Sequence, residues 1–297
     1  MTQARAVTGW PLRALGLGAG AALAAVATGL VVDPGRPAAG HVQNLELGLM
    51  RGAVTGLLIG PFAARLRLPA RQRAALLLAY TFVLSALTNW IESSAYNLPG
   101  AGTRMLLVQL PGVLVVAALL TALYPPAAAD ASLAAVLGEA VRRRPAAGWA
   151  WRLAAAGLLF IPCYIVLGAL ITPWVDAYWT GATAVRLGLR PPPLATILLL
   201  EAGRGLLYAV TLLPVVLLMG GSRLRSAGWG SLTFCGLAAV PLLWYTAWPL
   251  PLRVAHLLEI SGSLVAFCAA AAWLLGWRQR QAGRRPSPTP EPARLGR

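Results

Sequence analysis

The sequence predicts an all-α protein: a polytopic membrane helix bundle of about eight transmembrane helices, with both termini in the cytoplasm. Three observations lead to this prediction. Of the 297 residues, 58% are hydrophobic and only 11% are charged, a composition far from that of a soluble domain of this length. Apolar runs of about 20 residues, long enough to cross ~30 Å of hydrocarbon, recur along the chain. The arginines gather in alternate loops, which orients the chain in the membrane.

Eight apolar runs have the length of a membrane span. In chain order they cover residues 11–32, 44–63, 74–96, 105–124, 151–173, 194–219, 229–249 and 252–277. Only the corner Trp248-Pro249-Leu250-Pro251 separates the last two. The first run has the basic start of a signal peptide, but it continues to Val32 and is longer than the apolar part of such a peptide. We therefore expect a retained span.

Arginine counts predict the orientation of these spans. The loops and ends on one side hold 18 arginines and the opposite loops hold five; with Arg51 and Arg204 inside spans, these make up all 25 basic residues. The positive-inside rule then places both termini in the cytoplasm. Between the fourth and fifth spans, we expect a short helix capped by Asp130 and ended by Pro145. The use of arginine without lysine indicates a GC-rich bacterial genome, and hence the bacterial cytoplasmic (inner) membrane.

The predicted domain organisation is a single transmembrane bundle over residues 1–277, followed by a tail. Residues 278–297 are basic and rich in proline, which predicts a disordered cytoplasmic tail. A weak repeat links RGAVTGLLIGP at 51–61 with RGLLYAVTLLP at 204–214. Two four-helix halves, 1–125 and 150–277, would explain this repeat. Ordinary packing roles for the glycines and prolines are the alternative.

Eight polar residues within or near the spans form the predicted site. A charged side chain near a helix centre costs ~2.5–3.5 kcal/mol on insertion, so such residues normally face the protein interior. Given the orientation of each span, they all fall in the outer half of the bilayer, where a shared outward-facing polar cavity would collect them. The alternatives are interfacial charges and a purely structural clamp between helices. The candidates are Glu46, Arg51, Asn89, Glu92, Glu201, Arg204, His256 and Glu259.

Helical spacing predicts which of these residues pair. Residues three apart share a helix face, so Glu201 reaches Arg204, and His256 reaches Glu259. Glu46 and Arg51 are five apart and do not pair, so we expect Arg51 to meet Glu92 or Asn89 on the next helix.

These residues predict binding or transport of an anionic solute or lipid head group. The arginines would hold the anion, and the glutamates with His256 would exchange protons. One alternative is an intramembrane enzyme that acts on a lipid-linked substrate through His256, Glu259 and Glu201. The other is a structural or assembly protein. The sequence specifies neither catalytic residues nor an oligomeric state.

Cofactors, metals and nucleic acid are not expected. The three cysteines, Cys163, Cys235 and Cys268, lie in apolar runs without a CxxC spacing, and the chain has no HExxH motif. The net charge of +16 is explained by orientation in the membrane. Membrane lipid is therefore the expected partner, together with the anion itself.

Overall fold

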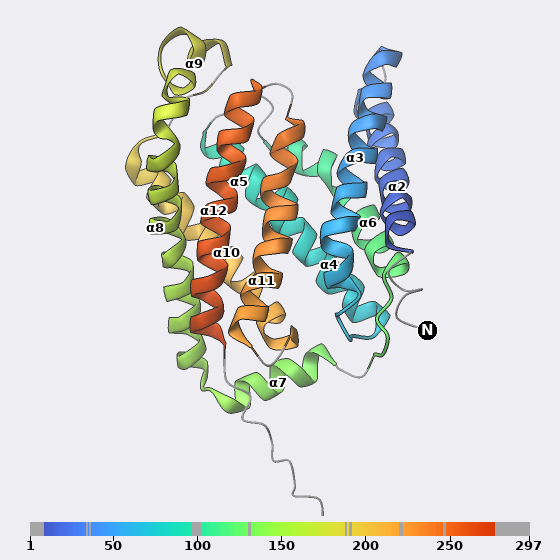
Figure 1. Ribbon diagram of the computed structural model, residues 1–297, viewed down its shortest axis with the longest axis vertical. Helices are drawn as coiled ribbons and strands as arrows, with labels where there is room; N and C mark the ends of the chain where they lie inside the picture. The colour runs from blue at the N-terminus through green and yellow to red at the C-terminus, as the bar shows by residue number, and fades with distance from the viewer. Residues whose placement is uncertain are drawn as a thin grey trace, which may run out of the picture.

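The chain folds into a bundle of membrane-length helices. The computed structural model describes residues 9–33, 35, 37–96, 102–129, 132–187, 189, 192–219, 222–245 and 248–276, with Arg104 described by its backbone alone. Within these ranges the structure contains helices and no strands, and eight segments are long and apolar enough to cross a membrane. The predicted all-α polytopic bundle is thus confirmed (Figure 1). The predicted tail at 278–297 and the predicted cap Asp130 lie outside the described residues.

The first four spans include one that is broken. The unbroken ones are α2 (Trp10–Val32), α3 (Ala38–Ala63) and α6 (Thr103–Leu123). The third span consists of α4 (Ala70–Thr81), the π-helical segment η1 (Phe82–Leu87) and α5 (Thr88–Ala95). A π-helical turn widens the helix locally and often marks a functional region.

The last four spans repeat this arrangement. The unbroken ones are α8 (Ala146–Trp179), α10 (Leu194–Met219) and α12 (Leu250–Leu275). The seventh span consists of α11 (Arg223–Phe234), the π-helical η2 (Cys235–Ala239) and the 3₁₀-helical η3 (Val240–Trp244). The bounds of α10 are those predicted, whereas α8 has 34 residues and is about 51 Å long at ~1.5 Å per residue, so it extends beyond the hydrocarbon.

Two short helices connect spans at opposite ends of the bundle: α7 (Leu133–Arg143) at the lower end in Figure 1, and α9 (Gly181–Leu187) at the upper end. The predicted loop helix is thus present as α7, but its N-terminal cap is Ser132 rather than Asp130. Glu139 accepts hydrogen bonds from Arg142 and Arg143, and these bonds lower the pKa of the Glu139 carboxyl.

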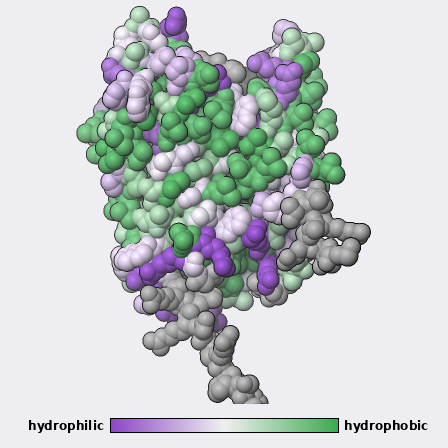
Figure 2. Space-filling view, viewed as in Figure 1, coloured by the Kyte–Doolittle hydropathy of each residue, from purple (hydrophilic) through white to green (hydrophobic). Residues whose placement is uncertain are grey.

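The surface polarity of the bundle differs between its middle and its lower end. Figure 2 shows a middle region of mostly hydrophobic residues above a band of hydrophilic ones. The α3–α4, α6–α8 and α10–α11 connections belong to this lower end, because each span reverses direction. Most of the arginines that predicted the orientation lie in these connections or in the helix turns next to them, such as Arg223 and Arg225 at the start of α11.

Glycines bring pairs of helices into close contact. On α3, Gly48, Gly52 and Gly56 are spaced four apart and face α2. A Cβ atom at Gly52 would lie 2.7 Å from the Cα of Gly18, and one at Gly48 would lie 2.6 Å from the Cα of Ala22. Small residues at this spacing allow the backbones of two membrane helices to approach. Accordingly, α2 and α3 stand side by side at the right edge of Figure 1.

A continuous group of aromatic rings fills the centre of the bundle. Tyr208 of α10 contacts Phe160 of α8 with ring centroids 5.0 Å apart, and it contacts Phe234 of α11 at 5.4 Å. Phe234 in turn meets Tyr80 of α4 at 5.6 Å. All four rings are fully buried. This core joins the two halves of the chain and supports the polar groups that lie one helical turn from Tyr208.

Candidate functional site

The charged residues of α10 lie in the interior of the bundle. Glu201, Arg204 and Tyr208 share one face of the helix, and all three are buried. Arg204 Nη1 donates a hydrogen bond to Glu201 Oε1 at 3.0 Å, and Nη2 donates to the Tyr208 hydroxyl at 3.3 Å. The predicted pairing of Glu201 with Arg204 is therefore confirmed.

A second carboxylate reaches Arg204 from the third span. Glu92 Oε2 of α5 lies 3.3 Å from Arg204 Nη2. The two carboxylates differ in their surroundings, because the side chain of Glu92 is 19% exposed and that of Glu201 is completely buried. Arg204 thus has one inaccessible partner on its own helix and one accessible partner on another helix.

Aromatic rings surround the Arg204 guanidinium. Its Cζ atom lies 5.7 Å from the centre of the Phe160 ring and 5.9 Å from the centres of the Tyr164 and Tyr208 rings. These distances are at the outer limit of cation–π attraction. The rings also keep water from the guanidinium, which strengthens its attraction to the carboxylates.

The second pair lies on α12. His256 Nδ1 is 2.6 Å from Glu259 Oε2, which confirms the predicted pairing, although the contact does not have the alignment of a hydrogen bond. Both pairs pack against the same face of α8, because Arg204 Cζ lies 5.9 Å from the centre of the Tyr164 ring and Glu259 lies against Gly168 one turn further on. The two pairs therefore form one cluster, which we call the charge cluster: Glu92, Glu201, Arg204, His256 and Glu259.

A close helix contact holds Glu259 in place. A Cβ atom at Gly168 of α8 would lie 3.0 Å from Glu259 Oε1. A side chain at this position would force the carboxylate to shift. Gly168 therefore leaves room for Glu259 between α8 and α12.

Aromatic residues cover His256 towards the upper end of the bundle. The imidazole ring lies 5.4 Å from Trp248 and 6.2 Å from Trp179, measured between ring centroids. Trp179 also meets Tyr96, whose hydroxyl is 3.4 Å from that of Tyr164. Rings from α8 and the α12 entrance thus cover His256, and Tyr96 of the third span packs beside them.

Three of the predicted site residues lie elsewhere. Glu46 and Arg51 are exposed, and Arg51 Nη2 donates to the backbone oxygen of Trp244 at 3.4 Å. The prediction that Arg51 meets Glu92 or Asn89 is therefore wrong, because Glu92 turns towards Arg204 instead. Asn89 Nδ2 donates a hydrogen bond to the backbone oxygen of Ser85, one turn earlier in the same span, at 2.9 Å. Five of the eight candidates come together.

The aromatic members of the site were hard to recognise from the sequence. Tyr164 and Tyr208 stand inside apolar runs, and Tyr96 and Trp179 stand near the ends of spans. An aromatic residue in such places is normally part of the core or an interfacial anchor. The available signals were the aromatic cluster PWVDAYWTG around Trp179, which could also be read as a substrate platform, and the position of Tyr208, four residues after Arg204 and on the same helix face.

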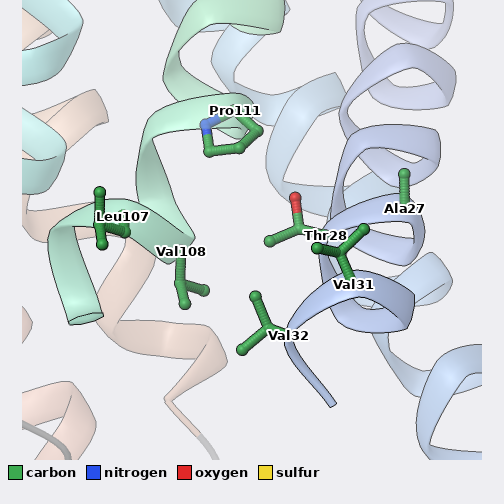
Figure 3. A pocket seen from close by; sticks show the side chains of 7 residues that line it. All are labelled: Ala27, Thr28, Val31, Val32, Leu107, Val108 and Pro111. Atoms are coloured by element: carbon green, nitrogen blue, oxygen red, sulfur yellow. The ribbon is translucent and has the colours of Figure 1, made fainter. Parts of the chain in front are cut away.

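An apolar groove lies between α2 and α6 (Figure 3). It has a volume of about 510 Å³. Its lining consists of Ala27, Thr28, Val31, Val32, Leu107, Val108 and Pro111. None of these seven described lining residues is charged, so they suit a hydrocarbon chain and offer an anion no partner.

The charge cluster does not resemble a metal site. Across the described ranges, no three His, Cys, Asp or Glu side chains are grouped so that they could share a metal ion. The arrangement instead presents three carboxylates, one imidazole and one guanidinium, which suits ion pairing and proton exchange.

Compared with known proteins, the chain matches no protein-family model, no curated protein and no solved structure.

Proposed function

We propose that this multi-pass membrane protein binds and transports an anionic solute or lipid head group at Arg204, and that a proton is taken up as the anion binds. The observation that carries this proposal is the unequal pair of carboxylates on Arg204. Glu201 is completely buried, whereas Glu92 is 19% exposed and comes from another helix at 3.3 Å. Glu92 is therefore the partner that an incoming anion can replace.

The exchange follows from the chemistry of the guanidinium. Its planar set of donors matches a carboxylate or a phosphate. When the anion takes the place of Glu92 on Nη2, the Glu92 carboxylate loses its positive partner next to a new negative charge. Proton uptake by Glu92 removes this repulsion. The net event is the binding of one anion and one proton, while Glu201 keeps Arg204 in position.

The location of the site in the membrane is part of the proposal. The arginine-rich connections at the lower end of the bundle support a cytoplasmic location for that end and for both termini. Since α10 and α12 begin at the upper end, the charge cluster then lies in the outer half of the membrane. The arginine usage supports a bacterial cytoplasmic membrane.

Replacing Glu92 with glutamine tests the proposal. Sulfate and short-chain phosphatidylglycerol, whose charges do not change between pH 5.5 and 7.5, serve as probes. We expect the wild-type protein to bind the effective probe up to about tenfold more tightly for each unit by which the pH falls, because one proton is taken up. Glu92→Gln should bind it tightly at both pH values. Thermal shift in detergent, titrated with each probe, measures these affinities.

One control variant and two contrary outcomes make this experiment decisive. Asn89→Ala, one turn away on the same helix face, should leave the pH dependence unchanged, because Asn89 bonds only to its own helix in the structure. An anion effect that is equal in wild type and Glu92→Gln at both pH values would contradict the exchange. No effect of either probe on any variant would favour a purely structural role for the charge cluster.

The His256–Glu259 pair favours a second candidate function, an enzyme acting on a lipid-linked substrate. A carboxylate 2.6 Å from an imidazole can orient it as a general base. Glu201, which the sequence suggested as a third member, is engaged with Arg204. Incubation of wild type and His256→Gln with a total membrane lipid extract, followed by mass spectrometry, would distinguish the functions. A lipid product formed only by wild type supports the enzyme, and identical lipid profiles contradict it.

A further inference from the structure

The two halves of the chain share a pattern of helix breaks at a constant separation of 153 positions. Helix α4 begins at Ala70 and α11 begins at Arg223, and each has 12 residues. Each then passes into a π-helical segment, which begins at Phe82 in η1 and at Cys235 in η2. Because π-helices are rare, two at matching positions indicate a common design.

The same separation relates the second spans of the two halves. Arg51-Gly52 of α3 corresponds to Arg204-Gly205 of α10, and Pro61 corresponds to Pro214. The packing corresponds as well. Gly52 lies against Gly18 in the first span of its half, and Gly205 lies against Gly157 in the first span of the other half. Matching residues therefore occupy matching places in each four-helix half.

Contacts between the halves show how the two are related. The Tyr80 hydroxyl lies 2.5 Å from the Thr233 hydroxyl, and these residues are themselves 153 positions apart. Corresponding residues touch each other only where a two-fold axis passes between them. The segments η1 and η2 also contact each other, as expected near such an axis.

The two arginines follow this two-fold relation. Arg204 crosses to Glu92 of the third span, and Arg51 crosses to Trp244 of the seventh. The residue at the position of Glu92 in the second half is Tyr245, directly after Trp244. Arg51 thus occupies in the first half the place that Arg204 occupies in the second.

The first half lacks the carboxylates that neutralise Arg204. Gly48 stands at the position of Glu201, and α2 leaves it no room, since a Cβ atom there would lie 2.6 Å from the Cα of Ala22. Tyr245 stands at the position of Glu92. Among the described residues, Arg51 forms one hydrogen bond, to the Trp244 oxygen at 3.4 Å, and its side chain is exposed.

We propose that the chain consists of two four-helix repeats about a two-fold axis, and that Arg51 forms a second anion site, which takes a phosphate group. A guanidinium has five N–H donors, and most of those on Arg51 are not used within the described structure. A charged side chain in a membrane span needs a counter-charge, and phosphate meets a guanidinium in a bidentate geometry. The phosphate comes from a lipid head group or from solution. The proposal shares with the proposed function only the choice of an anion as ligand.

The test uses the purified full-length chain in detergent. Its melting temperature is measured with short-chain phosphatidylglycerol, with short-chain phosphatidylcholine as the zwitterionic control, and with inorganic phosphate. Phosphatidylglycerol is expected to raise the melting temperature of wild type, and Arg51→Gln should lose the part of this rise that comes from Arg51. A rise with phosphate alone would identify the free anion as the ligand, whereas a rise with phosphatidylglycerol alone would identify the lipid head group.

A second variant tests the two-fold relation at the same site. Tyr245→Glu places a carboxylate at the position of Glu92, where it should occupy Arg51 and reduce the effect of phosphatidylglycerol as much as Arg51→Gln does. Tyr245 is 39% exposed, so the surface accepts the change. Tyr245→Gln, without the charge, should respond like wild type. Loss of the effect in Arg51→Gln but not in Tyr245→Glu would overturn the two-fold placement.

Comparison with Glu92→Gln separates this site from the one at Arg204. An effect of phosphatidylglycerol that survives in full in Arg51→Gln overturns the second site, even where Glu92→Gln shows that Arg204 binds an anion. An effect lost in Arg51→Gln and unaltered by Glu92→Gln supports the second site and contradicts the proposed function.

Discussion

Replacing Arg204 with methionine is expected to lower the free energy of unfolding by about 3–5 kcal/mol, the usual cost of breaking a buried ion pair by removing one partner. The change leaves the completely buried Glu201 carboxylate without its hydrogen-bond donor. It also leaves the Tyr208 hydroxyl without the guanidinium. Unfolding by sodium dodecyl sulfate in mixed micelles, followed by tryptophan fluorescence, measures the loss.

A double variant shows whether this loss comes from the ion pair. Glu201→Gln combined with Arg204→Met removes both buried charges and should recover most of the stability that Arg204→Met loses. Glu92 is partly exposed and tolerates the loss of its partner better than Glu201 does. Losses that simply add in the double variant would contradict the pairing of Glu201 with Arg204.

Replacing Gly205 with alanine is expected to destabilise the protein by about 3 kcal/mol, the upper part of the usual range for overpacking. A Cβ atom there would collide with the backbone oxygen of Gly157 and would lie 2.7 Å from the Cβ of Phe160. Because the backbone of α8 cannot move aside alone, α8 and α10 would have to separate. The same denaturation experiment measures the effect.

Gly203 provides the matched control two residues away on the same helix. A Cβ atom at Gly203 meets nothing within 4 Å, so Gly203→Ala should leave stability unchanged or raise it, since alanine favours helix. By the two-fold relation, Gly52→Ala should destabilise the protein about as much as Gly205→Ala does. Equal stabilities of Gly203→Ala and Gly205→Ala would contradict the close contact of α8 with α10.

The sequence predicted the spans well because the length of an apolar run is a local property. The bounds of α10 are those predicted, and all eight spans are present. The start of the seventh span was placed at 229, whereas α11 begins at Arg223. Its first turn contains Arg223 and Arg225, which a search for apolar residues excludes, and its π-helical break has no simple sequence signal.

The candidate site was predictable only in part. Pairs within one helix, such as Glu201 with Arg204, follow from helical spacing and were predicted correctly. The partner of Glu92 was not, because depth in the membrane does not tell which helices are neighbours. Glu46 illustrates the same limit: the sequence predicts the same depth for it as for the others, but it lies on an exposed face of α3.

The central claim, that an anion exchanges with Glu92 at Arg204 while a proton is taken up, is tested most directly by counting the protons. Isothermal titration calorimetry with the effective anion, repeated at one pH in buffers of different ionisation enthalpy, gives the number of protons bound per anion. Sulfate and short-chain phosphatidylglycerol are suitable because neither exchanges protons itself in this range. The account predicts close to one proton for wild type and none for Glu92→Gln. Anion binding without proton uptake in wild type would contradict it.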